Sequence, residues 1–182
     1  MYPVSDAFLR AIRSNTRTYF WTGTIVTKGG MTYEFGAKEI VKGSGYISRQ
    51  CCGSTEIELG TVYAAEMGIT LLSDIDRYTL EDAQVTLVFH LVLADGSVED
   101  VPMGVFEVSE ANRLAKCLEL KAYDFMLRFD RSFNGFETVG TAYDFIALCC
   151  KMCRVEFAHK RAEIDAMPNG GVTLSVYTEN DI

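Results

Sequence analysis

Apolar and polar residues alternate along most of the first two thirds of the chain, in short runs that turn residues separate. The most regular run extends from Ala83 to Leu93, where each odd-numbered residue from Val85 onward is apolar. A period of two residues is typical of a β-strand with one face in a core. Val88 and Val92 make the second face partly apolar, so we expect this strand to be central and covered on both faces.

Neighbouring segments carry the same signal. Residues 18–27 are rich in aromatic and β-branched side chains, Lys28-Gly29-Gly30 follows them, and residues 31–35 then alternate again. This pattern predicts a β-hairpin. The Asp95-Gly96 pair predicts a second tight turn, because both residue types accept a positive φ. Further strands are predicted for residues 46–51, 55–59, 63–72, 98–108 and 114–122, with a polar turn at 111–113.

Helical periodicity appears on both sides of this β-rich region. Residues 5–14 form a short amphipathic pattern, and Ser5 is its expected N-cap. A stronger pattern extends from Thr141 to Arg154, where Thr141 and Asp144 have the spacing of a capping box. Its apolar stripe consists of Phe145, Leu148, Cys149 and Met152.

These elements predict an α+β fold that is mainly antiparallel β. We expect a small β-barrel with an N-terminal helix and a helical C-terminal part, because a meander of this length usually closes into a barrel or folds into a sandwich. Residues 123–129 and 159–167 add shorter helical segments. We place a barrel domain at residues 1–130, and a helical segment with the start of a following domain at residues 131–182.

The end of the chain favours a continuation into a longer protein. Residues 171–177 alternate as a strand, and Thr178 and Asp181 then repeat the capping-box spacing. A capping box stabilises nothing without the helix that it begins. We therefore expect this chain to be an N-terminal fragment.

Composition describes a packed protein. Hydrophobic residues make up 48% of 182 residues and charged ones 23%, so a sizeable core can form without disulfides or a metal. The net charge of −8 opposes stable binding to nucleic acid or to an anionic membrane. The N-terminus lacks the pattern of a secretory signal, and no segment approaches the ~18 consecutive apolar residues of a membrane span. We expect synthesis in the cytoplasm, with the cysteines as free thiols.

The two histidines are the first candidates for general acid or base chemistry. His90 alternates with core residues on a predicted strand, and no serine or cysteine motif lies beside it, so a structural role is favoured. His159 lies among Lys160, Arg161 and Glu163, which is typical of a solvated surface. We therefore predict no catalytic residue.

The cysteines are the candidates for a metal or redox site, because Cys149, Cys150 and Cys153 include a C-x-x-C spacing. The upstream pair, Cys51-Cys52, fits a metal poorly, since adjacent residues on a strand point to opposite faces. Cys149 shares the apolar stripe of its helix, and the C-x-x-C lies inside that helix rather than at its start, which argues against thioredoxin-like chemistry. Core thiols are favoured, with no metal and no cofactor.

Two further groups have plain structural interpretations. Glu56, Glu58 and Glu66 could supply an acid/base pair, but the polar side of a sheet edge or an interface is preferred. An aromatic group could stack on a base or a sugar, but a hairpin with one face in the core is preferred. Glycine-rich phosphate loops are absent from the sequence. The aromatic group is Tyr19, Phe20, Trp21, Tyr33 and Phe35.

Seven segments share their turn and strand patterns with one protein family: residues 2–5, 15–17, 22–25, 47–51, 58–66, 102–108 and 120–126. They resemble the N-terminal region of bacteriophage and prophage tail-tip proteins, the baseplate-hub or tail-associated proteins of long-tailed phages. The resemblance covers most of the chain, and its motifs are structural rather than catalytic.

This resemblance implies a non-catalytic β-barrel related to tail-tube proteins, arranged as a trimer that joins the tail tube to the tip. It implies distal-tail, tube and tape-measure proteins as partners, and the virion tail tip as the location. An acidic protein also suits a conduit through which DNA slides. Two alternatives remain: a small-ligand-binding β-barrel with a wide apolar interior, and a zinc or thiol protein that uses Cys149, Cys150 and Cys153.

Overall fold

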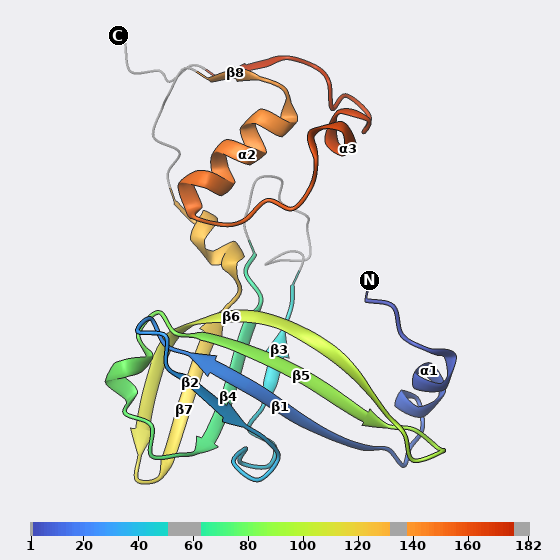
Figure 1. Cartoon of the computed structure of the whole chain (residues 1–182), viewed down its shortest axis with the longest axis vertical. Helices are drawn as coiled ribbons and strands as arrows, with labels where there is room; N and C mark the ends of the chain where they lie inside the picture. Colours follow the sequence, from blue (N-terminus) through green and yellow to red (C-terminus); the bar gives the residue numbers. More distant parts are fainter. Residues whose placement is uncertain (1, 51–62, 132–137, 177–182) are drawn as a thin grey trace. The chain divides into compact units, whose positions relative to one another are not determined.

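The computed structural model describes residues 2–50, 63–131 and 138–176. The chain forms two compact units, Met1–Met126 and Leu127–Ile182 (Figure 1). The predicted strand at 55–59 and the capping box at Thr178 and Asp181 lie outside the described residues.

Unit 1 consists of a short helix and a seven-stranded antiparallel sheet in the order β2-β1-β5-β6-β7-β4-β3. A 3-10 helix, η1, precedes β5, and another, η2 (Phe125–Phe129), lies at the boundary between the units. The elements of unit 1 are α1 (Asp6–Ile12), β1 (Thr18–Val26), β2 (Thr32–Phe35), β3 (Tyr46–Ser48), β4 (Glu66–Leu72), η1 (Arg77–Leu80), β5 (Gln84–Val92), β6 (Val98–Leu114) and β7 (Cys117–Tyr123).

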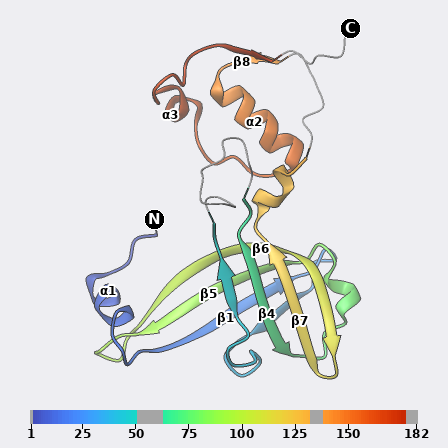
Figure 2. The ribbon, with the colours of Figure 1, turned by 180° about the vertical axis from the view of Figure 1, so that it is seen from behind.

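The long strand β6 belongs to both halves of the sheet. Its residues 98–107 pair with β5, and its residues 107–114 pair with β7. The register shifts on both sides of this strand, and Gly104 has a φ of 119°, which favours glycine. Bulges bend a strand, so the two halves of the sheet fold over one another, and Figure 2 shows β4 and β7 in front of β1 and β5.

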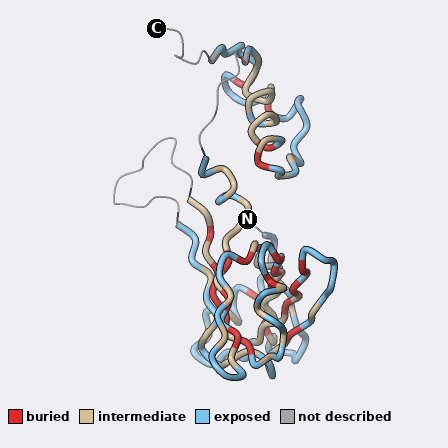
Figure 3. Tube along the Cα trace, turned by 90° about the vertical axis from the view of Figure 1, so that its left-hand side faces the viewer, coloured by how far each residue is buried: buried red, intermediate tan, exposed pale blue. Residues whose placement is uncertain are grey.

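The core lies between the two halves. Alternate residues of β5 and β7 are buried there, and Figure 3 shows buried positions along the sheet. The largest side chain among those with almost no exposure is Phe106. The predicted phase of β4 and β5 is confirmed by the core residues Met67, Ile69, Leu71, Val85, Leu87 and Leu91.

The predicted closed barrel is not found, because no ladder joins the edge strands β2 and β3 within the described residues. β2 stops at Phe35, and a turn at Gly36 takes the chain away from β1. The chain then pairs with the end of β4, where the Val41 N–H donates to the Thr70 carbonyl at 2.9 Å. Among the residues that the structure describes, the sheet is therefore bridged at one end and open at the other.

Several local predictions are confirmed. Ser5 caps α1 and accepts a hydrogen bond from the Phe8 N–H at 3.0 Å. The Asp95-Gly96 turn joins β5 to β6, with Gly96 at a φ of 83°. The predicted polar turn at 111–113 is wrong: those residues continue β6, and the chain turns instead at Ala115, whose φ is 53°.

Unit 2 contains α2 (Ala142–Cys153), α3 (Arg161–Asp165) and a two-stranded sheet of β8 (Thr138–Gly140) and β9 (Leu174–Val176). The helix predicted from Thr141 is confirmed, and it ends at Arg154 in a left-handed conformation. The segment predicted as helical at 159–167 contains α3. No helix in the described parts of the chain is both long and apolar enough to span a membrane.

Candidate functional site

The open end of the sheet holds a cleft of about 510 Å³, which we call the β1–β3 cleft. It exists because β2 covers only Gly23–Val26 of β1, so the first half of β1 has no neighbour on that side within the described residues. Apolar side chains from both sheet halves and from the connecting segment line the cleft: Trp21, Ile40, Ile47, Ile69 and Leu87.

Backbone groups of β1 point towards this cleft. Successive residues in a strand direct their N–H and C=O groups to opposite sides. Thr27 donates its N–H to the Met31 carbonyl on the β2 side at 2.9 Å, so the same side carries the N–H and C=O groups of Trp21 and Tyr19. Because β2 ends opposite Gly23, these groups have no ladder partner within the described part of the chain.

Aromatic side chains hold this end of β1. Phe89 of β5 lies against Trp21 with ring centroids 5.2 Å apart, and against Tyr19 at 5.5 Å. Phe8 of α1 contacts the same ring edge-on at 6.4 Å. Packing therefore fixes this strand edge, although no described strand pairs with it. The sequence-based preference for a core-facing hairpin is confirmed for Phe35, which is buried, and for Trp21 and Tyr33, which pack against the core.

The charge around the cleft is opposite to that of the whole chain. The ionised side chains among its described lining residues are Arg17 and Lys42, both exposed. The net charge of the chain is −8. The cleft thus combines an unpaired strand edge, an apolar wall and a positive rim.

A chain of three polar side chains lies on the opposite face of β1, β5 and β6. The Thr22 hydroxyl lies 2.7 Å from His90 Nε2, and His90 Nδ1 lies 2.6 Å from the Asp100 carboxylate. The ring of Phe20 stacks on the imidazole at 4.5 Å and 10°. With its proton on Nδ1, His90 donates to Asp100 and accepts from Thr22.

This order of hydroxyl, imidazole and carboxylate is the order of a hydrolytic triad. Such a triad also needs N–H donors that are free to stabilise an oxyanion. Here the N–H groups of Thr22 and Gly23 lie in the ladders with β5 and β2. The arrangement therefore gives both ring nitrogens of the half-buried His90 a hydrogen-bond partner. The adjacent N–H groups of Thr22 and Gly23 are not available to stabilise an oxyanion, because they lie in the ladders.

Sequence reasoning missed this chain of contacts. His90 was recognised as part of a strand, but Thr22 and Asp100 are 68 and 10 residues away from it. The hairpin around Asp95 could have indicated the pairing of His90 with Asp100, since each lies five residues from Asp95.

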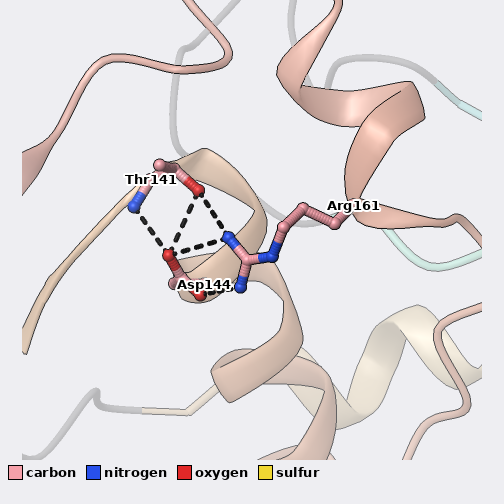
Figure 4. A network of polar contacts seen from close by, with 3 residues as sticks. All are labelled: Thr141, Asp144 and Arg161. Atoms are coloured by element: carbon pink, nitrogen blue, oxygen red, sulfur yellow. Dashed lines mark hydrogen bonds and ion pairs between the residues drawn. The ribbon is translucent and has the colours of Figure 1, made fainter.

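Unit 2 has a polar cluster at the start of α2, shown in Figure 4. The Thr141 N–H donates to the Asp144 carboxylate at 2.9 Å, which confirms the predicted contact between these residues. The guanidinium of Arg161 in α3 donates one hydrogen bond to each carboxylate oxygen of Asp144. This guanidinium, together with the Thr141 N–H, holds the pKa of Asp144 far below its usual value.

The remaining candidates are dispersed. His159 is exposed and contacts Glu163 at 3.1 Å. Glu66 accepts from the Tyr46 hydroxyl at 2.6 Å, and this contact lowers the pKa of Glu66. Glu56 and Glu58, like Cys51 and Cys52, lie outside the described residues.

The cysteines of α2 differ in burial from the predicted stripe. Cys150 and Cys153 are buried, whereas Cys149 is only half-buried. Burial raises the pKa of the Cys150 thiol, with smaller contributions from its two cysteine neighbours. No group of three or more potential metal ligands occurs among the described residues.

Comparisons with known proteins complete the description of the site. No family model and no curated protein matches the sequence. Among solved structures, the chain is similar to part of a "Virion of native gene transfer agent (GTA) particle", with a TM-score of 0.48 and 11% identity. The match covers 76% of this chain and 51% of the other, so this chain spans about half the length of that protein. A likeness at this level carries no conclusion about function.

Proposed function

We propose that this chain is a non-catalytic structural component of a phage or prophage tail tip, of the baseplate-hub type. The observation that supports it is the seven-stranded sheet of unit 1, which wraps around one core and, among the described residues, leaves half of β1 without a strand on one side. An unpaired strand edge is a template for joining another chain, and ring-forming proteins need such edges.

The sequence resemblance to tail-hub proteins adds the location and the partners. We propose three copies around the tail axis, in contact with distal-tail, tube and tape-measure proteins. The net charge of −8 supports a protein that surrounds DNA without holding it.

Electron cryo-microscopy of the particle that contains this protein tests the proposal. We expect three copies in a ring at the tail tip. A single copy per particle, or a location away from the tail tip, would refute the proposal.

Complementation tests the non-catalytic part separately. A deletion of the gene is rescued with wild type, with Thr22→Val, or with the control Thr24→Val, which lies on the same sheet face. We expect all three to restore infectious particles. Loss of particles with Thr22→Val alone, at normal protein level, would indicate that the polar chain of Thr22, His90 and Asp100 is needed for activity.

A small-ligand-binding function is the second candidate, because the apolar β1–β3 cleft has the volume of a small-molecule site. A thermal-shift screen of fatty acids and aromatic compounds tests it. Saturable stabilisation by one compound, lost on Trp21→Ala, would favour this function over the structural one.

A further inference from the structure

We infer that the β1–β3 cleft binds an extended segment of a neighbouring polypeptide, which adds a strand to β1 and carries acidic residues beside apolar ones. The proposed structural role supplies the neighbouring protein, but the binding chemistry of the cleft stands on its own geometry.

The backbone of β1 defines the shape of the occupant. Tyr19 and Trp21 present two N–H and two C=O groups on one line, and this line continues the edge that β2 occupies along Gly23–Val26. Only an extended chain places donors and acceptors at the same spacing, so a strand antiparallel to β1 fits as β2 does.

The cleft wall defines which side chains such a strand carries. Alternate side chains of an added strand would face inward, towards Leu87, Ile69 and Ile47. Burial of aliphatic side chains there removes apolar surface from water on both partners. Small β-branched residues suit these positions, since they favour extended backbone.

The rim defines the charge of the occupant. Arg17 and Lys42 lie at the cleft, and no acidic residue is among its described lining residues. Acidic residues at the ends of the added strand would meet these cations, whereas basic ends would be repelled. The chain as a whole has a net charge of −8, but the charged side chains that line the cleft are positive. We therefore propose an acidic segment of a partner as the occupant.

The cleft also has a built-in reporter. Trp21 is the single tryptophan of the chain and lines the cleft. Its fluorescence therefore reports occupancy directly, without a label.

The test uses the full chain and the synthetic peptide acetyl-Glu-Val-Thr-Val-Thr-Glu-amide. We expect saturable changes in Trp21 fluorescence, together with shifts of the Tyr19 and Trp21 backbone amides in NMR spectra. A peptide with lysine at both ends should bind at least about fivefold more weakly. A peptide N-methylated at all four residues between its two glutamates should not bind, because none of these residues keeps an N–H that could pair with β1.

Two pairs of variants separate the edge from the rim. Tyr19→Pro removes an N–H that faces the cleft and leaves the ladder to β5 intact, whereas Tyr19→Val removes only the ring. We expect Tyr19→Pro to weaken binding about tenfold relative to Tyr19→Val. Lys42→Glu should weaken binding of the acidic peptide and improve binding of the basic one, while the exposed control Lys38→Glu should change neither.

Several outcomes would overturn the inference. Equal binding of the N-methylated peptide would mean that the cleft holds a small apolar ligand or side chain rather than a strand. Self-association of the chain that Tyr19→Pro abolishes and the peptide cannot displace would assign the edge to a second copy. If Tyr19→Pro does not fold, Lys42→Glu alone tests the inference. An unchanged preference of Lys42→Glu for the acidic peptide would refute the claim that the positive rim selects an acidic segment. Failure of tail-tip location with retained peptide binding would remove only the proposed function.

Discussion

Unit 1 and unit 2 are stabilised by different kinds of contact. Unit 1 buries a continuous cluster of aliphatic and aromatic side chains between the halves of one sheet. The buried side chains of unit 2 among the described residues are Cys150, Cys153 and Ile164. At the start of α2, Thr141, Asp144 and Arg161 form a network of hydrogen bonds. Long-range strand pairing therefore supplies most of the buried surface of unit 1, whereas unit 2 depends more on polar contacts at the start of its helix α2.

A cavity in the core of unit 1 should lower the stability of the protein more than any of the substitutions that follow. Phe106 is 1% exposed, and Phe106→Ala should lower the free energy of unfolding by about 3–5 kcal/mol. Urea unfolding followed by Trp21 fluorescence measures it. The half-exposed Met31→Ala is the control and should cost no more than about 0.5 kcal/mol. A similar loss for both variants would contradict a core-dominated unit 1.

A polar change in the same unit should have a smaller effect. Thr22→Val keeps the shape of the side chain but leaves His90 Nε2 without its hydroxyl donor, which should cost about 1–2 kcal/mol. The same unfolding assay measures it, with Thr24→Val as the matched control. An unchanged midpoint would mean that water replaces the hydroxyl. Hydrolysis of p-nitrophenyl acetate by the wild type above that of Thr22→Val would contradict the non-catalytic proposal.

In unit 2 the comparable test is the helix end. Thr141→Ala removes the hydroxyl that contacts Asp144 and Arg161, and should destabilise α2 by about 1 kcal/mol. Amide hydrogen exchange within α2 measures it, because it reports each unit separately. The exposed Thr173→Ala is the control. Unchanged protection of α2 in Thr141→Ala would show that the capping box does not stabilise unit 2.

The stability of α2 in unit 2 should also depend on pH, with a smaller change than in the three variants above. The pKa of Asp144 is lower in the folded protein than its ordinary value of 3.8, mainly because of Arg161. The contribution is therefore fully present above pH 3.8, and it is lost as the pH falls below that value towards the folded pKa. Exchange protection of α2 should decrease over this range, less steeply at high salt because the pair is partly exposed. Arg161→Gln should flatten the decrease, and an equally steep decrease in that variant would assign it to another group.

Local features were predictable from the sequence because they depend on neighbours within a few residues. The Ser5 cap, the Asp95-Gly96 turn and the alternation of β5 follow from side-chain chemistry and backbone preferences alone. Where two local signals competed, the prediction failed: residues 111–113 are polar as a turn is, but pairing with β7 keeps them in a strand. Beyond Glu107 the strand β6 pairs with β7 but no longer with β5, and an antiparallel strand with one solvated face accepts polar side chains.

The candidate cleft could not be predicted, because it results from where strands stop. Residues 31–35 indicate a strand, but its pairing with only the second half of β1 depends on the turn at Gly36 and on the bond from Val41 to Thr70. The buried cysteines show the same limit. The helical period identified α2, yet its neighbours in unit 2 decide that Cys150 rather than Cys149 is buried.

Residue patterns alone indicated most of the strands and helices, the acidic character of the chain and the antiparallel β class. Only the pairing of distant segments leaves the sheet without a closing ladder among the described residues, brings Thr22 to His90 across 68 residues, and places Arg17 and Lys42 beside the same cleft. The physical reason is that hydrophobic alternation specifies which face of a strand is buried, but carries no information about which strand lies beside it. Register, bulges and the points at which strands end make that choice, and they form only when distant segments pair.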